Sequence, residues 1–317
     1  MTGVQTCALP IWGGTELKGA CFNESGLVRD FRFPSGNLRA VDAAGCNAIC
    51  LKLRDMAATL PGRSHLWLIG AAGADDLQAA ARLKETLGGC DEQSEGVEIF
   101  SDYACNHAAC LAGGDGILSI NGTGSVLYGV NGDKKARIGG WGYLLDETPS
   151  GSLFGKRAVE GVLRHLEGEP GYAAFAQAWE RRFDKPDRRH IIDELYRSSG
   201  IQNRLGTFAP VLTDAFDAEN KAASRMVIDS VNLLARSLTH LMQQLAMSQA
   251  EAVGSGGLWA GWAPFQEMMT GACRQHKLDI IWKKRACELF MGPLILHART
   301  DYASADLKKL LITGVKQ

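Results

Sequence analysis

The sequence lacks a long apolar run and an excess of charge of either sign. Its longest uncharged stretch, residues 116–132, is interrupted by polar residues and glycines, whereas a membrane-spanning helix needs about 20 apolar residues. The 34 basic and 35 acidic side chains leave a formal net charge of −1, so no overall field favours nucleic acid or an anionic membrane. We therefore expect no nucleic-acid partner and no membrane partner.

The cysteines do not form a recognisable disulfide or metal framework. Nine of them, an odd number, are spread over 317 residues, which is typical of free thiols in a reducing compartment. Neither Cys46/Cys50 nor Cys105/Cys110 has the two-residue gap of a zinc knuckle. We expect buried thiols, a cytoplasmic location and no metal held by protein ligands.

The first residues need separate treatment. Residues 1–11 look like the translation of a sequencing adapter joined to the reading frame, and they lack the basic start and apolar run of a signal peptide. We predict that this segment is not native and that most of the native first strand is missing.

Strand and helix patterns alternate along the chain, which predicts a mixed α/β protein. Strands are expected at residues 17–22, 27–33, 66–69, 97–100, 116–120, 125–130 and 136–139, and helices at residues 38–59, 75–87, 103–112 and 227–245. The last hairpin turns at Asn131-Gly132, a strong hairpin signal. No fixed-period repeat or low-complexity linker separates the parts. We place an N-terminal domain at 1–112 and a C-terminal domain at 113–317, whose last helix could pack back on the first domain.

Glycine is in excess, with 37 of 317 residues, or about 12% against a usual 7%. Gly13-Gly14-Thr15 offers backbone N–H groups that an anion can approach, although for this segment taken alone a bare turn is the favoured explanation. Asn121-Gly122-Thr123-Gly124-Ser125 forms the tip of a strand hairpin that presents amides and hydroxyls together. This tip suits a phosphate, but it is not a P-loop because no Gly-Lys-Ser/Thr ending is present.

Three further segments could bind a ligand. Gly254, Gly256 and Gly257 would let a flat ring lie against backbone, or make an ordinary strand-to-helix turn. Gly139-Gly140-Trp141-Gly142-Tyr143 could fold over a sugar ring, or Trp141 could fill a core. Asp102 follows a predicted strand, where it could cap the next helix or act as a base toward a bound hydroxyl.

Taken in their order along the chain, these segments resemble those of the sugar kinases of the actin-like ATPase superfamily, and within it the N-acetylglucosamine kinase and BadF-type ATPase group. The resemblance runs from Gly13 to about His297. It implies two ribonuclease-H-like lobes of the actin, hexokinase and Hsp70 type with an interlobe cleft, and it is compatible with a homodimer.

The resemblance also implies residue roles for phosphoryl transfer from ATP with Mg²⁺ to an amino sugar, with N-acetylglucosamine as the favoured substrate. Asp102 would be the catalytic base. ATP would contact Gly13, Gly14, Thr15, Gly122, Thr123, Gly124, Ser125, Gly254, Gly256 and Gly257, and the sugar would contact Asn37, Asp102, Gly140, Trp141 and Glu147.

Two positions depart from the family pattern. The family's first motif, Asp-Gly-Gly-Gly-Thr, would put its Asp on Ile11 and its first Gly on Trp12, so the carboxylate expected near Mg²⁺ is absent. After the segment that corresponds to residues 143–145, the family has Gly-Asp-Glu-Gly-Ser-Gly, whereas this chain has Asp-Glu-Thr-Pro-Ser-Gly at residues 146–151. An alignment without gaps puts Glu147 where the family has Asp. A BadF-type ATPase and a non-catalytic sugar or nucleotide sensor therefore remain alternatives.

Overall fold

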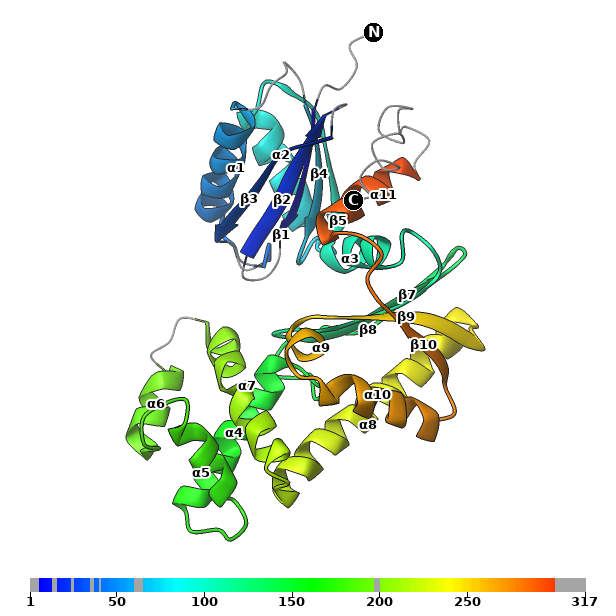
Figure 1. Cartoon of the computed structure of the whole chain (residues 1–317). Coiled ribbons are helices and arrows are strands. Elements are labelled where there is room, and N and C mark those ends of the chain that lie inside the picture. Colours follow the sequence, from blue (N-terminus) through cyan, green and yellow to red (C-terminus); the bar gives the residue numbers. More distant parts are fainter. Residues whose placement is uncertain are drawn as a thin grey trace. The chain divides into compact units, whose positions relative to one another are not determined.

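The computed structural model describes residues 6–12, 16–23, 26–34, 37–39, 41–59, 65–196 and 200–299. It divides into two compact units, one formed by residues 1–114 together with 284–317, and the other by residues 115–283. The elements of each unit are labelled in Figure 1.

Unit 1 is built on a five-stranded sheet in the order β3-β2-β1-β4-β5. Its elements are β1 (Thr6–Trp12), β2 (Glu16–Asn23), β3 (Gly26–Pro34), α1 (Ala43–Ala57), β4 (His65–Ala71), α2 (Leu77–Cys90), β5 (Ser94–Ser101), α3 (Asp102–Cys110), the short η1 (Leu289–Met291) and α11 (Gly292–Ala298). β1, β4 and β5 are parallel, so their carboxyl ends meet at one edge.

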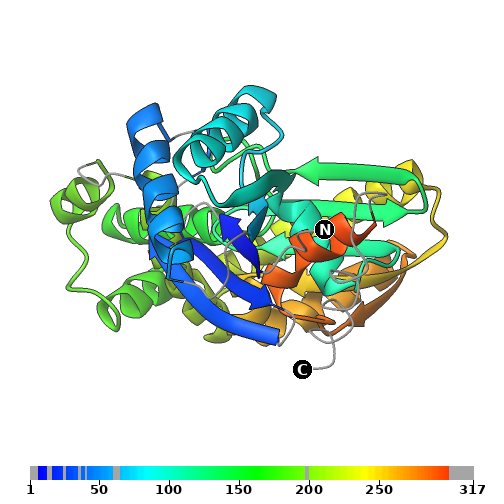
Figure 2. The same ribbon diagram turned by 90° about the horizontal axis from the view of Figure 1, so that it is seen from above.

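Two apolar layers cover the two faces of this sheet because side chains alternate along each strand. Leu17 and Cys21 of β2 point toward α1 and α2, whereas Ala20 and Phe22 point toward α3, η1 and α11. Helices α1 and α11 therefore lie on opposite sides of the sheet (Figure 1; Figure 2).

The segment predicted to be non-native supplies the central strand of this sheet. Residues 6–12 form β1, which pairs with β2 on one side and with β4 on the other. The position of the first strand, expected to be largely missing, is thus filled by these residues.

Unit 2 has a second five-stranded sheet, in the order β10-β9-β6-β7-β8. Its elements are β6 (Gly116–Asn121), β7 (Ser125–Asn131), β8 (Lys134–Gly139), α4 (Gly151–Leu166), α5 (Ala173–Glu180), α6 (Arg188–Tyr196), α7 (Ile201–Asp217), α8 (Lys221–Leu245), β9 (Gln249–Ser255), α9 (Gly257–Gly261), α10 (Pro264–Gln275) and β10 (Asp279–Lys283). One large core joins the sheet to its helices, and α8, which contains the helix predicted at residues 227–245, buries an apolar stripe in it.

The eight cysteines whose side chains are described are free thiols, and six of them are buried, as predicted. Among the described residues, no helix is long and apolar enough to cross a membrane.

Candidate functional site

A buried asparagine ties the tip of the β6–β7 hairpin to the rest of unit 2. Asn121 Nδ2 donates to Ser125 Oγ (3.1 Å) and to the Pro149 carbonyl oxygen (2.7 Å). Its Oδ1 accepts from Ser119 Oγ (2.7 Å) and from the Trp259 indole N–H (2.8 Å). Because buried polar groups are costly to leave unpaired, this network fixes the shape of the tip.

Two backbone N–H groups of the hairpin tip are available to bind a ligand. The Gly122 N–H donates to the Gly124 carbonyl oxygen (3.0 Å), but the N–H groups of Thr123 and Gly124 donate to no atom in the described part of the chain. A Cβ added at Gly122 would meet only the Gly256 Cα, at 4.0 Å. Open space and successive free amides are what an anion-binding turn requires.

The segment of Gly254, Gly256 and Gly257, predicted to contact the ATP ring system, lies directly against this tip. Gly256 has φ +102°, and a Cβ there would lie 2.6 Å from the Asn121 carbonyl and the Gly122 nitrogen. Only glycine combines that backbone conformation with so close an approach. A Cβ at Gly257 would meet nothing within 4 Å. The two glycine segments are thus parts of one surface.

Gly254, by contrast, is covered by a side chain of the protein itself. A Cβ there would fall within the Trp259 indole, so the flat ring that lies against this glycine belongs to the protein. The space above Gly254 is filled, and the open part of the segment is Gly257.

The N-terminus of α4 also lies at the tip. The Gly151 N–H donates to the Gly122 carbonyl oxygen (2.7 Å), and the Ser152 N–H and Oγ both donate to the Thr123 carbonyl oxygen (3.1 and 2.7 Å). The positive end of a helix dipole favours a nearby anion. The sequence analysis did not assign this role to α4, although Ser150-Gly151-Ser152 before an apolar helix was its signal.

The glycine-rich loop after β8 exposes its tryptophan. Trp141 is 71% exposed, so the core-filling alternative is wrong. Gly140 and Gly142 both have positive φ, at +75° and +89°. Asp146 Oδ2 accepts from the N–H groups of Trp141 (2.8 Å) and Gly142 (3.2 Å), which closes the loop. Burial, the largest cause, raises the pKa of Asp146, against the lowering effect of these hydrogen bonds. The sequence analysis did not single out Asp146.

Two of the predicted sugar contacts share a pocket of about 270 Å³ in unit 2. It is lined by Ser125, Ile138, Trp141, Asp146, Glu147 and Leu233, among others. Because Ser125 belongs to the hairpin tip, this pocket adjoins the candidate phosphate surface. Its mixture of apolar walls and a few polar groups is typical of small-molecule sites.

In unit 1, Asp102 stands where parallel strands end. It is the first residue of α3, and the cap position is taken by Ser101, whose side chain makes no capping hydrogen bond. Asp102 thus occupies the first turn of α3 and not its cap position. Its side chain is half-buried. Together with the larger effect of burial, the charge of Asp102 raises the pKa of the Cys105 thiol.

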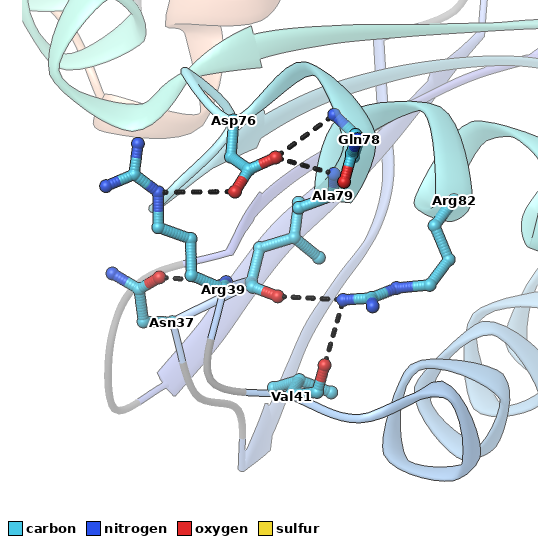
Figure 3. A network of polar contacts seen from close by, with 8 residues as sticks. Asn37, Arg39, Val41, Asp76, Gln78, Ala79 and Arg82 are labelled. Atoms are coloured by element: carbon cyan, nitrogen blue, oxygen red, sulfur yellow. Dashed lines mark hydrogen bonds and ion pairs between the residues drawn. The ribbon is translucent and has the colours of Figure 1, made fainter.

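Asn37 comes to the same edge of the sheet. The Leu38 N–H donates to the Ala72 carbonyl oxygen (2.9 Å), directly after β4. Ala71 pairs with Ser101 in the neighbouring strand. The carboxyl ends of adjacent strands thus bring together the segments that carry Asn37 and Asp102, which are 65 positions apart. Figure 3 shows Asn37 within its network of polar contacts.

Gly13, Gly14 and Thr15 lie outside the described residues, so their predicted phosphate contacts stay a prediction. Ile11, where the family pattern has Asp, is in β1, half-buried, and lines a pocket of about 370 Å³ with Lys18 and Arg285. No group of three or more His, Cys, Asp or Glu side chains in the described ranges could hold a metal ion.

Comparisons with known proteins agree on the architecture. A candidate N-acetylglucosamine kinase from Chromobacterium violaceum superposes with a TM-score of 0.73 at 17% identity, covering 93% of this chain and 99% of that one. A second, from Porphyromonas gingivalis, gives 0.68 at 19% identity over 94% and 99%. The chain has the sugar kinase fold. A hexokinase of the ROK family from Thermus thermophilus shares the sugar kinase fold more distantly, with a TM-score of 0.55 at 15% identity over 92% and 97%.

The sequence comparison points the same way. The chain is 24% identical over 187 residues to the N-acetylmuramic acid/N-acetylglucosamine kinase of Clostridium acetobutylicum. That alignment covers 58% of this chain and 60% of the relative. No protein-family model matches the chain. The sugar kinase fold, with a five-stranded sheet in each unit, confirms the predicted fold class.

Proposed function

We propose that this chain is a kinase that transfers the γ-phosphoryl group of ATP to a hydroxyl of an N-acetylated amino sugar, with N-acetylglucosamine as the favoured substrate. The observation that carries the proposal is the contact of Gly256 with Asn121 and Gly122. It joins two glycine segments, far apart in sequence, into one surface with free amides beside the N-terminus of α4. The names of the similar kinases support the substrate class.

The nucleotide would use unit 2 chiefly. The free N–H groups of Thr123 and Gly124 would bind phosphate oxygens, as amides of a hairpin tip can. The adenosine would lie beside Gly256 and over Gly257, where a Cβ would meet nothing within 4 Å. The phosphate contacts expected of Gly13, Gly14 and Thr15 stay a prediction from the sequence.

Asp102 would act on the acceptor. Its carboxylate would accept a hydrogen bond from the sugar hydroxyl and take the proton as the oxygen bonds to the γ-phosphorus. The bond from that phosphorus to the bridging oxygen breaks, and ADP leaves. Positioning and charge neutralisation supply most of the acceleration in such reactions, and general-base help contributes about 10²- to 10⁴-fold.

In unit 1, Asn37 would contact the sugar from the sheet edge that also carries Asp102. Gly140, Trp141 and Glu147 come from unit 2, where the loop shape depends on Asp146. An exposed tryptophan next to polar groups is suited to a sugar ring, because its face is apolar and the ring hydroxyls need partners.

Magnesium enters as part of the substrate, bound to the phosphates of ATP. Mg²⁺ on a nucleotide keeps several waters and uses one or two protein carboxylates. The described residues do not fit this role well, because position 11 carries isoleucine and these residues include no ligand cluster. The roles proposed above belong to the chain's own groups.

The test is ADP release with ATP, Mg²⁺ and a panel of amino sugars, on the wild type, Asp102→Asn and Asp55→Asn. Asp55 is an exposed carboxylate of α1 that pairs with Arg54 (2.5 Å), so its substitution is the matched control. We expect sugar-dependent release in the wild type and the control, and a loss of about 10²- to 10⁴-fold in Asp102→Asn with ATP binding retained. Near-normal turnover of Asp102→Asn would refute the assigned base.

Ile11 favours a second candidate, a sensor that binds sugar or nucleotide without catalysis, because the family's carboxylate is absent from that position. A BadF-type ATPase is the third. The same assay separates them: release without added sugar indicates the ATPase, and retained binding without release indicates the sensor.

A further inference from the structure

A second pocket in unit 2 adjoins the one that is lined by Trp141 and Glu147. Its volume is about 270 Å³, the same as that of the first pocket. Glu147 and Leu233 belong to the walls of both pockets. A ligand larger than one sugar ring could therefore extend from the first pocket into the second past these two side chains.

The walls of the second pocket carry equal numbers of positive and negative side chains. Three arginines and three carboxylates line it, namely Arg157, Arg164, Arg225, Glu147, Glu160 and Asp229. Glu160 accepts from Arg157 Nη1 (2.9 Å) and from Arg164 Nη2 (3.2 Å), so part of this set forms one network along α4. Because the charges balance, the pocket favours neither an anion nor a cation. It suits a neutral ligand with many hydrogen-bonding groups.

Two of the charged residues are available to such a ligand. Arg225 and Asp229 lie one turn apart on the same face of α8, and both are exposed. In the described part of the chain, neither side chain forms a hydrogen bond or an ion pair. The guanidinium offers a fork of donors and the carboxylate offers two acceptor oxygens, so each can pair with two neighbouring hydroxyls.

The remaining walls are aromatic and apolar. Tyr172 is half-buried, and the Arg164 guanidinium carbon lies 5.6 Å from its ring centroid. Leu153 and Leu233 add aliphatic surface. A sugar ring has apolar faces and a rim of hydroxyls, so a site for it combines aromatic surface with polar side chains.

We propose that the second pocket is a subsite for a second sugar ring, joined by a glycosidic bond to the amino sugar in the first pocket, so that the substrates include disaccharides of N-acetylglucosamine. Arg225 and Asp229 would bind hydroxyls of the second ring, and Tyr172 would contact its apolar face. The inference rests on the proposed function, because it takes the first pocket as the sugar site. Hydrogen bonds to charged groups are worth about 10- to 100-fold in affinity, and the lower end applies here because both residues are exposed.

The experiment compares N-acetylglucosamine with N,N′-diacetylchitobiose, in which two N-acetylglucosamine residues are joined by a β-1,4 linkage. Either ring of the disaccharide can occupy the first pocket, with the other ring attached at C1 or at C4. Both kcat/KM and calorimetric binding are measured for the wild type, Arg225→Gln, Asp229→Asn and Arg236→Gln. Arg236 is an exposed arginine about three turns further along α8 that lines neither pocket, so its substitution is the matched control.

We expect Arg225→Gln and Asp229→Asn each to lower kcat/KM for the disaccharide by about 10-fold, through a higher KM, and to leave the monosaccharide within about threefold. The loss falls on KM because the second ring is remote from the hydroxyl that reacts. Arg236→Gln should change neither sugar.

The outcomes separate this inference from the proposed function. If N-acetylglucosamine is phosphorylated but the disaccharide neither binds nor reacts, the inference is overturned and the kinase stands. The same conclusion follows if Arg225→Gln and Asp229→Asn affect the two sugars equally or affect neither. If no sugar is phosphorylated, the kinase proposal fails, and calorimetry alone decides the inference. Disaccharide binding that weakens in either variant but not in Arg236→Gln then supports the subsite, and absent or unchanged binding overturns it.

Discussion

At the scale of single residues, Gly256 is the position of the candidate nucleotide surface at which an added side chain should be most harmful. Its φ of +102° is strained for any other residue, and a Cβ would lie 2.6 Å from the Asn121 carbonyl. We expect Gly256→Ala to destabilise the protein by about 1–3 kcal/mol and to weaken ATP binding, because the tip must move away. Thermal unfolding and calorimetric titration with ATP measure the two effects.

Gly271, inside α10, is the matched control. A Cβ there would meet nothing within 4 Å, so Gly271→Ala should stabilise the protein by up to about 1 kcal/mol through helix propensity and leave ATP affinity unchanged. We therefore expect the two substitutions to change the free energy of unfolding in opposite directions. A stable Gly256→Ala variant with wild-type ATP affinity would show that the close contact is not required.

Asp146 gives the site a pH dependence with a defined sign. Burial raises its pKa, so the folded state binds the proton more tightly than the unfolded chain. Its contribution to stability is therefore fully present at acid pH and is lost as pH rises through the raised value. In Asp146→Asn one amide oxygen can still accept both loop N–H groups, which converge on a single oxygen in the wild type.

We expect Asp146→Asn to have a higher free energy of unfolding than the wild type at neutral pH, with a difference that shrinks toward about pH 4, near the ordinary pKa of Asp. Urea unfolding across that range measures it. A constant difference at all pH values would contradict the expectation, since it would mean that the proton of Asp146 plays no part.

At the scale of elements, the sequence predicted most strands and helices but misplaced the start of α1. A helix was expected from residue 38, and α1 begins at Ala43, capped by Asp42, whose side chain accepts from the Gly45 N–H (2.7 Å). The preceding residues form the Asn37 loop because Arg82 and Ala72 bind their backbone groups. Those partners lie at least 30 positions away, so local pattern could not indicate them.

The strands at the far edge of the second sheet escaped prediction for a related reason. β10 alternates exposed and half-buried residues at the sheet edge and has only five residues, too few for periodicity to separate it from a loop. Asp102 and the tip at Gly122 were predictable because each follows a clear strand. The contact of that tip with Gly256 was not, since it depends on the pairing of β6 with β9.

β1 carries the clearest test of the incomplete first motif. Ile11 takes the place of the expected carboxylate and is half-buried, so we predict that Ile11→Asp raises Mg²⁺-dependent ADP release by about 10-fold or more, as an added ligand near the phosphates should. Ile11→Asn, of similar size without the charge, is the control. Equal rates in the two variants would remove the metal explanation for this position.

At the scale of the whole molecule, unit 1 is assembled from both ends of the chain. η1 and α11 pack on α3, and a Cβ at Gly292 would collide with the Cys105 backbone. This close approach explains why a glycine opens α11. The sequence analysis allowed for such a return of the last helix, but nothing in the local pattern specified α3 as its partner.

The two proposed ligand surfaces predict that nucleotide and sugar protect different segments of the chain from hydrogen exchange. A non-hydrolysable ATP analogue alone should slow exchange at residues 121–126 and 254–258, because it orders amides that the tip leaves free. N-acetylglucosamine alone should act at residues 37–41, 101–104 and 140–147. β10, at the outer edge of the second sheet, is the internal reference. Nucleotide protection confined to residues 140–147 would reverse the assignment of the two surfaces, and the tip at Gly122 would then have no phosphate to bind.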